Sequence, residues 1–236
     1  MGQCLATLLS EHCDLMICSR VLDRAKAVSC KVSAKAAEIE GCSDRDIVFL
    51  AVPTKTLSST AAMVSGIMPV RSLIVDISSV KCGVVEVIDK SLPQHICYVS
   101  IHPLFSSPGA RIKNTIVVPI RPGPWMQAFT NLLLSSGIRV YKASMEEHDK
   151  AMAATQVIHH FALLSMKRTL AEMGYANLKS LEPYVTNSLR KTMSIVRLLE
   201  KNLETIEMIQ RTNKFSSSSR KNFIETANRL DEKYAC

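Results

Sequence analysis

Residues that can exchange protons or bind anions follow two short apolar runs in the first half of the sequence. The segment DISSVK spans residues 76–81, and His102 follows the run at 97–101. If both runs are strands of one parallel sheet, these residues lie at the carboxyl ends of strands, where open α/β sheets bind ligands. An unperturbed imidazole, with a pKa of about 6.5, can accept a proton near neutral pH. The two segments therefore predict a ligand site with a proton acceptor.

A second set of residues fits a dinucleotide site. Gly2 opens a helical stretch, as the third glycine of a GxGxxG turn does before the helix that receives the pyrophosphate. An initiator methionine followed by a small residue gives the same pattern. Ser19 and Arg20 end a strand where NAD-binding folds carry an acidic residue, and an arginine there favours the 2'-phosphate of NADP over NAD. A further cofactor turn is expected at Ala51, Val52 and Pro53.

The elements that position these residues alternate between strands and helices. Runs rich in β-branched residues predict strands at 14–19, 46–52, 72–77, 97–101, 115–120 and 138–142. Helical patterns fill most of the intervals between them. This alternation predicts an α/β fold with a doubly wound, Rossmann-type parallel sheet covered by helices.

The pattern changes near residue 144. Ser144 and Glu147 form a capping box, and a helical period continues to Met173, with Gly174 as its C-cap. The remainder is helical or turn, with a hinge predicted at 215–219. We therefore expect a dinucleotide-binding domain at 1–143 and an all-helical domain at 144–236. The helical domain is small for an independent core, so we expect it to form a homodimer.

Composition and charge narrow the class of partner. The chain has 236 residues, 47% of them hydrophobic, and a formal net charge of +8. Lys and Arg are dispersed and aromatic residues make up 5%, which disfavours nucleic acid as a partner. An anionic small molecule and a merely solvated basic surface remain as explanations of the charge. No apolar run reaches the roughly 18 residues of a membrane span, and we expect no membrane partner and a soluble, cytoplasmic protein.

The cysteines and histidines do not predict a metal site. The eight cysteines are scattered without a CxxC pair, which indicates reduced thiols and no disulfide framework. A metal site of His148, His159 and His160 fails on geometry, because His148 and His159 are 11 residues apart, about 16 Å of helix and too far to share one ion. By themselves His160 and Arg197 are typical of a satisfied helix histidine and a surface cation.

Five segments in order carry a resemblance to a known family. They are DIVFLAVP at 46–53, DISSVK at 76–81, IHPLF at 101–105, EEHDKAMA at 146–153 with His160 following, and RLLEKNLETIEMIQRTN at 197–213. Together they resemble the prephenate dehydrogenase family in its compact form, without a fused mutase or regulatory domain. The resemblance implies an oxidoreductase of tyrosine biosynthesis that oxidatively decarboxylates prephenate, or its amino relative arogenate.

The resemblance also implies roles for individual residues. His102 would accept the hydrogen bond of the ring hydroxyl, and Ser79 would hold that hydroxyl and the histidine in register. Arg197 and His160 would bind the substrate, a small dicarboxylate. Ser78 is assigned to the cofactor, and Lys81 is a weaker candidate.

Some positions depart from the family pattern. Many members continue after His-Pro with a glycine and a carboxylate, whereas this chain has Leu104 to Pro108 (LFSSP), and Ile206 replaces a tryptophan of some members. Because of these changes, the choice between prephenate and arogenate as the substrate remains open. The largest departure is that the first strand and the first two glycines of the fingerprint are missing before Gly2. We favour a mis-set start or a fragment over a native truncation, because that strand would lie in the middle of the sheet.

Two alternatives remain open. One is another NADP-dependent reductase of the same two-domain architecture, which would depend on a lysine such as Lys150 or Lys167. The other is a non-catalytic homologue, truncated at its N-terminus, whose helical half dimerises while the nucleotide half binds nothing.

Overall fold

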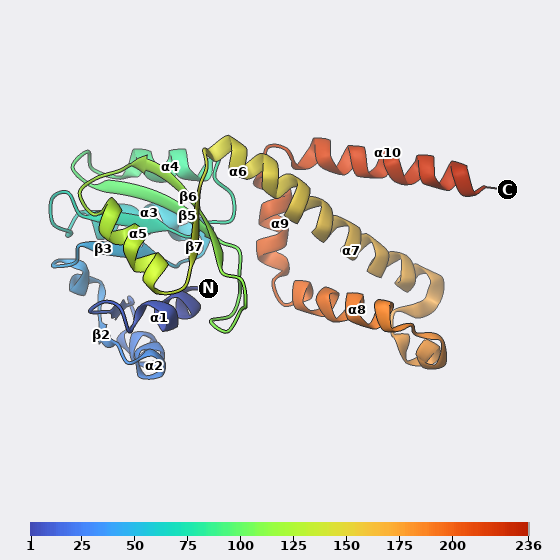
Figure 1. Cartoon of the computed structure of the whole chain (residues 1–236), viewed down its shortest axis with the longest axis horizontal. Helices are drawn as coiled ribbons and strands as arrows, with labels where there is room; N and C mark the ends of the chain where they lie inside the picture. The colour runs from blue at the N-terminus through green and yellow to red at the C-terminus, as the bar shows by residue number, and fades with distance from the viewer. Residues whose placement is uncertain (236) are drawn as a thin grey trace. The chain divides into compact units, whose positions relative to one another are not determined.

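The chain folds into two compact units. The computed structural model describes residues 1–235, so Cys236 lies outside the described residues, as do the side chains at positions 178 and 179. The units are Met1–Met145 and Glu146–Cys236 (Figure 1). Within residues 1–235, no helix combines the length and the apolar character that crossing a bilayer demands.

The first unit contains the strands. They are β1 (Met16–Cys18), β2 (Lys35–Ala37), β3 (Ile47–Leu50), β4 (Leu73–Asp76), β5 (Cys97–Pro103), β6 (Asn114–Arg121) and β7 (Arg139–Lys142). The sequence does not predict β2, because its residues Lys-Ala-Ala include no β-branched side chain. The other strands lie within one or two residues of their predicted bounds.

The strands form a mostly parallel sheet in two pieces. One piece has the order β3-β4-β5-β6-β7, and the other is the parallel pair β1-β2. Only the β5–β6 pairing is antiparallel among the described strands. The chain passes from β5 to β6 without a crossover helix, and such a connection cannot return the chain to the starting edge for parallel pairing.

Helices cover both faces of the larger piece. The helices of this unit are α1 (Gly2–Leu9), α2 (Leu22–Val32), α3 (Thr54–Ser65), α4 (Val84–Ser91), α5 (Met126–Ser135) and the 3-10 helix η1 (Ile39–Cys42). Leu73 and Val75 of β4 pack with α1 and α5 in one apolar cluster, whereas Ile74 between them packs with α3 and α4 in another. The alternation follows from the two-residue period of a strand.

Each piece of the sheet has an edge without a strand partner among the described residues. Within the described chain, β1 pairs only with β2 and β3 pairs only with β4. The side chains of Ile47 and Phe49 in β3 are therefore only half-buried, although both pack against the cluster that contains α1. Backbone donors and acceptors on these edges are available to a further strand.

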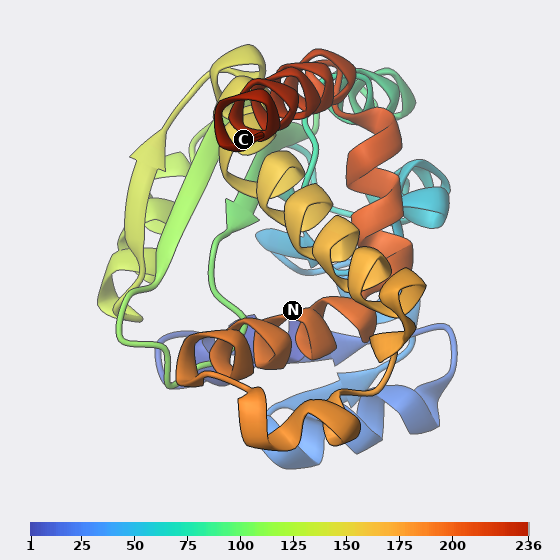
Figure 2. The ribbon, with the colours of Figure 1, turned by 90° about the vertical axis from the view of Figure 1, so that its right-hand side faces the viewer.

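The second unit is helical. Its elements are α6 (Met145–Met152), the π-helical turn η2 (Ala153–Val157), α7 (Ile158–Leu170), the π-helical turn η3 (Ala171–Tyr175), the 3-10 helix η4 (Leu178–Tyr184), α8 (Asn187–Glu200), α9 (Leu203–Thr212) and α10 (Ser216–Tyr234). Helix α7 packs against α8 and α10, as Figure 2 shows. Gly174, with φ of +88°, ends the long helix at the predicted position.

The hinge predicted at 215–219 is wrong in detail. Ser216 begins α10, and the hydroxyls of Ser216 and Ser218 bond to carbonyl groups of the preceding residues, as in Ser218 Oγ to Phe215 O at 3.0 Å. The change of direction lies at Asn213, whose Oδ1 accepts the Phe215 N–H at 2.9 Å. An Asx turn therefore replaces the hinge that the serine run suggests.

Candidate active site

The loop that follows β4 is held by hydrogen bonds to a buried carboxylate. Asp76 ends β4, and its Oδ1 accepts the backbone N–H of Ser78 at 2.8 Å. Its Oδ2 accepts the hydroxyl of Tyr98 at 2.7 Å, and Tyr98 has no exposed surface. Burial, followed by the charge of Asp76, raises the pKa of the Tyr98 hydroxyl, so this hydroxyl stays a donor. The carboxylate thereby fixes the start of the DISSVK loop on the neighbouring strand.

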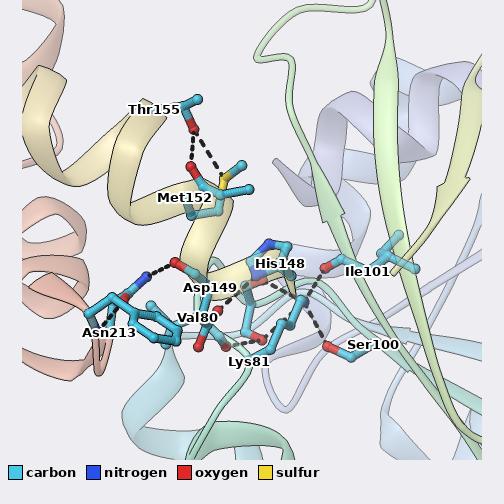
Figure 3. Close-up of polar contacts among 12 residues, drawn as sticks. Val80, Lys81, Ser100, Ile101, His148, Asp149, Met152, Thr155 and Asn213 are labelled. Carbon is cyan, nitrogen blue, oxygen red and sulfur yellow. Dashed lines mark hydrogen bonds and ion pairs between the residues drawn. The ribbon is translucent and has the colours of Figure 1, made fainter. Parts of the chain in front are cut away.

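Lys81 ties the end of the same loop to β5. Its side chain is fully buried, and its Nζ donates to Ser78 O at 2.8 Å, Ser100 Oγ at 2.7 Å and Ile101 O at 2.7 Å (Figure 3). The last of these acceptors belongs to the residue before His102. Reasoning from the sequence ranks Lys81 as a weak candidate, because spacing alone does not reveal that a lysine five residues after β4 contacts the next strand along the chain.

His102 and Ser79 occupy adjacent strand ends. In the β4–β5 register Asp76 pairs with Ser100, so the chain beyond each of these residues emerges at the same edge. His102 is 4% exposed and lies two residues after Ser100, on the sheet face where Ser100 contacts Lys81. Ser79 is half-buried in the loop. The structure thus brings the predicted proton acceptor and the predicted hydroxyl to one edge of the sheet.

The predicted cofactor residues Gly2 and Ala51 are in contact. A Cβ added to Gly2 would lie 2.6 Å from the Cβ of Ala51, which is too close for any residue other than glycine. Close packing of a helix on a strand is the role of the third glycine in a dinucleotide fingerprint. The N-terminus of α1 therefore lies beside the turn of Ala51, Val52 and Pro53.

Arg20 borders a shallow hollow at the end of β1. The hollow has a volume of about 250 Å³ and is lined by Arg20, Glu38, Ile39, Glu40, Met63 and Ile67. Arg20 is exposed, so its guanidinium is available to an anion. Ser19 has a local role, because its Oγ accepts the Val21 N–H at 3.3 Å where α2 begins.

His160 and Arg197 lie in the second unit, on α7 and α8. Burial, followed by the charge of the adjacent His159, lowers the pKa of His160 to about 4. The Nδ1 atom of His160 is buried without a hydrogen-bond partner among the described residues, and Arg197 is exposed. Neither a hydrogen bond nor an ion pair joins the two residues within the described part of the chain.

A buried pair in the second unit escapes the sequence reasoning. His148 Nδ1 lies 2.8 Å from Asp149 Oδ1, and both side chains have no exposed surface. The Asn213 amide donates to the carbonyl of Asp149 at 2.8 Å, which connects α6 to the chain after α9. The sequence suggests only that Asp149 is one of several acidic residues of a first helical turn. The one signal in the sequence that could have indicated this pair is that His148 and Asp149 are adjacent in the chain.

Comparison with protein families accounts for both units. Residues 17–115 match the family model described as the nucleotide-binding domain of prephenate dehydrogenase, and residues 144–234 match its dimerization domain. The chain belongs to the prephenate dehydrogenase family. The resemblance inferred from the five sequence segments is thereby confirmed.

Curated relatives of the family are distant and longer. A probable arogenate/prephenate dehydrogenase of Methanocaldococcus jannaschii is 24% identical over 231 residues, which cover 93% of this chain and 51% of the relative. A 4-amino-4-deoxyprephenate dehydrogenase of Streptomyces pristinaespiralis is 28% identical over 130 residues, which cover 55% of this chain and 44% of the relative. The chain spans about half the length of these two relatives.

Solved structures of the prephenate dehydrogenase family share the fold. The prephenate dehydrogenase of A. aeolicus, in complex with hydroxyphenyl propionate and NAD+, has a TM-score of 0.77 at 19% identity, covering 98% of this chain and 86% of that one. The arogenate dehydrogenase of Synechocystis has a TM-score of 0.75 at 17% identity, covering 98% and 87%. The predicted fold class, a Rossmann-type α/β unit followed by helices, is confirmed.

Proposed function

We propose that this chain catalyses the dinucleotide-dependent oxidative decarboxylation of prephenate or arogenate. The observation that carries the proposal is that His102 and the loop with Ser79 lie at the carboxyl ends of two neighbouring strands. Lys81 bonds the loop to Ile101, the residue before the histidine. Membership in the prephenate dehydrogenase family gives this arrangement its chemistry. A ligand rim at the carboxyl ends of parallel strands is the expected place for such a site.

His102 is the proton acceptor in this proposal. As the ring hydroxyl of the substrate becomes a carbonyl-like oxygen on the way to a phenol, its proton passes to the neutral imidazole. Ser79 donates to or accepts from the same hydroxyl and keeps it aligned with the imidazole. Release of carbon dioxide and aromatisation of the ring supply the driving force.

Arg197 and His160 bind the substrate in the proposal. A guanidinium can bind a carboxylate through two parallel charge-assisted hydrogen bonds. With a pKa of about 4, His160 is neutral near pH 7 and acts as a hydrogen-bond partner rather than as a cation. The assay described below compares three substrates. They are prephenate, arogenate and the 4-amino-4-deoxyprephenate named for the Streptomyces relative.

We call the part of the first unit that carries Gly2, Arg20 and Ala51 the dinucleotide edge, and these residues fit a nicotinamide cofactor. The contact of Gly2 with Ala51 brings the N-terminus of a helix beside a strand end, where backbone N–H groups favour a pyrophosphate. Arg20 favours the 2'-phosphate of NADP, although the A. aeolicus relative contains NAD+. The cofactor supplies the hydride acceptor when bound, while the chain binds and orients it.

The test is substrate-dependent formation of reduced dinucleotide by the whole chain. Prephenate, arogenate and 4-amino-4-deoxyprephenate are each assayed with NADP+ and with NAD+. We expect turnover with prephenate or arogenate, faster with NADP+, and a loss of about 100-fold or more in kcat for His102→Asn.

The matched control is His95→Asn, because His95 is an exposed histidine of the same unit. It should retain full turnover. If His102→Asn turns over as fast as the unmodified chain, His102 is not the acceptor, and a reductase that depends on a lysine becomes the better interpretation.

We also propose that the chain forms a homodimer through its helical unit. The match of residues 144–234 to a dimerization domain supports this proposal. Helices of this unit expose large apolar side chains, among them Ile195, Leu198, Leu203, Ile224 and Leu230. Exposed apolar groups on several helices of one unit are typical of an association surface.

A further inference from the structure

Two cysteines from separate segments meet at the carboxyl end of β1. Cys18 is the last residue of β1, and Cys42 is the last residue of η1. The two thiols are close enough to shift each other's pKa, and a Cβ on Gly41, the residue before Cys42, would lie 3.4 Å from the sulfur of Cys18. Cys42 is 3% exposed within an apolar cluster, and Cys18 is half-buried against that same cluster. Neither thiol has a role in the proposed catalysis.

A glycine allows the two segments to approach. The register of β1 and β2 pairs Cys18 with Ala37, and the chain then folds back through η1 so that Gly41 lies against both residues. A Cβ on Gly41 would lie 2.6 Å from the Cβ of Ala37 and 3.4 Å from the sulfur of Cys18. Without a side chain, Gly41 lets η1 lie directly on β1 and hold Cys42 against Cys18.

The surroundings make the two thiols chemically unequal. The neighbouring Cys42 side chain, and then the charge of Arg45, lower the pKa of Cys18, while burial opposes them. The neighbouring Cys18 side chain, followed by burial, raises the pKa of Cys42, and Glu40 adds to this effect. Arg45 is held by Asp44 at 2.6 Å and by Asp14 at 3.1 Å. Cys18 is therefore the more acidic thiol of the two and the better candidate for the attacking sulfur.

We propose that Cys18 and Cys42 form a reversible redox pair that a hydroperoxide converts to a disulfide. The Cys18 sulfur attacks one peroxide oxygen, the O–O bond breaks, and an alcohol or water leaves, so that Cys18 becomes a sulfenic acid. The Cys42 sulfur then attacks the Cys18 sulfur, the S–S bond forms, and the oxygen and the Cys42 proton leave as water. The two sulfurs lose two electrons, and the peroxide gains them.

We expect the disulfide to weaken dinucleotide binding, and this expectation rests on the proposed function. Cys18 directly precedes Ser19 and Arg20, and η1 contributes Ile39 and Glu40 to the hollow beside Arg20. An S–S bond is about 2 Å long, much shorter than a non-bonded contact between two sulfur atoms, so its formation draws η1 onto β1. Because the hollow is built from both segments, we expect it to narrow and the dinucleotide affinity to fall.

The first experiment tests the thiol pair without any reference to activity. The whole chain is treated with hydrogen peroxide in slight excess, and intact mass and peptide maps are recorded before and after reduction with dithiothreitol. We expect the loss of two hydrogen atoms and a peptide that joins Cys18 to Cys42, reversed by dithiothreitol. Cys18→Ser and Cys42→Ser should abolish the crosslink, whereas Cys13→Ser and Cys30→Ser, which remove exposed thiols, should not. Overoxidation of Cys18 without a crosslink, or a crosslink to another cysteine, overturns the proposal.

The second experiment titrates NADP+ into the reduced, oxidised and re-reduced chain. We expect oxidation to weaken binding about tenfold, re-reduction to restore it, and Cys42→Ser to remain insensitive to peroxide. Equal affinity of the reduced and crosslinked forms overturns the effect on the dinucleotide edge. If the reduced chain binds no dinucleotide while the crosslink forms, the proposed function fails and the redox pair stands on its mass and peptide map.

Discussion

A fully buried ammonium group holds two strand ends together at the proposed active site. Lys81 makes three hydrogen bonds of 2.7 to 2.8 Å to acceptors in the DISSVK loop and in β5. Burial of a cation is tolerated only where such acceptors replace its hydration. The backbone beside His102 is consequently positioned by a residue that has no exposed surface.

Removal of this ammonium group should destabilise the first unit. Lys81→Met keeps most of the side-chain volume but leaves the hydroxyl of Ser100 and the carbonyl of Ile101 without their donor. We expect the free energy of unfolding to fall by about 2 to 4 kcal/mol, measured by urea denaturation. The control Lys90→Met, at an exposed lysine of α4, should change it by less than about 0.5 kcal/mol. Equal stability of the two variants would show that Lys81 does not anchor the loop.

The half-buried imidazole of His160 should make stability depend on pH. Its pKa is about 4 in the folded chain, below the usual value of about 6.5. Between these values the unfolded chain binds a proton that the folded chain excludes, so stability falls as the pH is lowered through this window.

The dependence should disappear in His160→Gln. We expect this variant to lose about 1 kcal/mol of the stability difference between pH 6.5 and pH 4, a value reduced for the partial exposure of the ring. Urea denaturation at several pH values measures it, and His95→Gln at an exposed histidine is the control. An unchanged pH slope in His160→Gln would contradict the shifted pKa.

At the scale of the elements, the sheet is divided between β1 and β3. Each of these strands has one strand neighbour among the described residues, and half-buried apolar residues of β3 lie beside the open edge. In the doubly wound order the first strand lies between the second and the fourth. The open edges of β1 and β3 are the positions at which such a strand would pair.

A chain extended at its amino terminus by one strand and a glycine-rich turn should use both edges. The added backbone hydrogen bonds and the completed turn before Gly2 should raise the unfolding free energy and tighten NADP+ binding by about tenfold or more. Isothermal titration of both forms measures the difference, and an extension of equal length made of glycine and serine is the control. Equal affinity of the original and the extended chain would refute this prediction.

At the scale of the whole molecule, helices of the second unit expose large apolar side chains. Leu198 is 59% exposed on α8, and Leu230 is 47% exposed on α10. Where such side chains form a contiguous patch, they mark an association surface. The proposed homodimer would remove them from water.

A charge placed in this surface should separate the subunits. We expect light scattering to give twice the chain mass of 26.1 kDa for the unmodified protein and the single mass for the double variant Leu198→Glu, Leu230→Glu. Val70→Glu, at an exposed apolar residue of the first unit, should leave the dimer intact. A mass of one chain for the unmodified protein in light scattering would contradict the proposal.

The sequence predicts the fold well where local chemistry dominates. Runs rich in β-branched residues identify β3 to β7, and β4 and most of β5 are buried on both faces as such runs indicate. It does not predict β2, whose Lys-Ala-Ala sequence becomes a strand only through pairing with β1. For the site, the DISSVK loop and His102 are recognised from their places after strands, whereas the His148–Asp149 pair is not.

The sequence by itself determined the family, the α/β order of the first unit and the helical character of the second, because these follow from periodicity and from motifs read along the chain. Only the tertiary structure decided that Lys81 bonds to β5, that Gly2 packs on Ala51 and that Cys18 meets Cys42. The reason is physical: each of these contacts joins residues at least nineteen positions apart, and their approach depends on strand register and helix packing. Side-chain distances of this kind leave no periodic signal in the sequence.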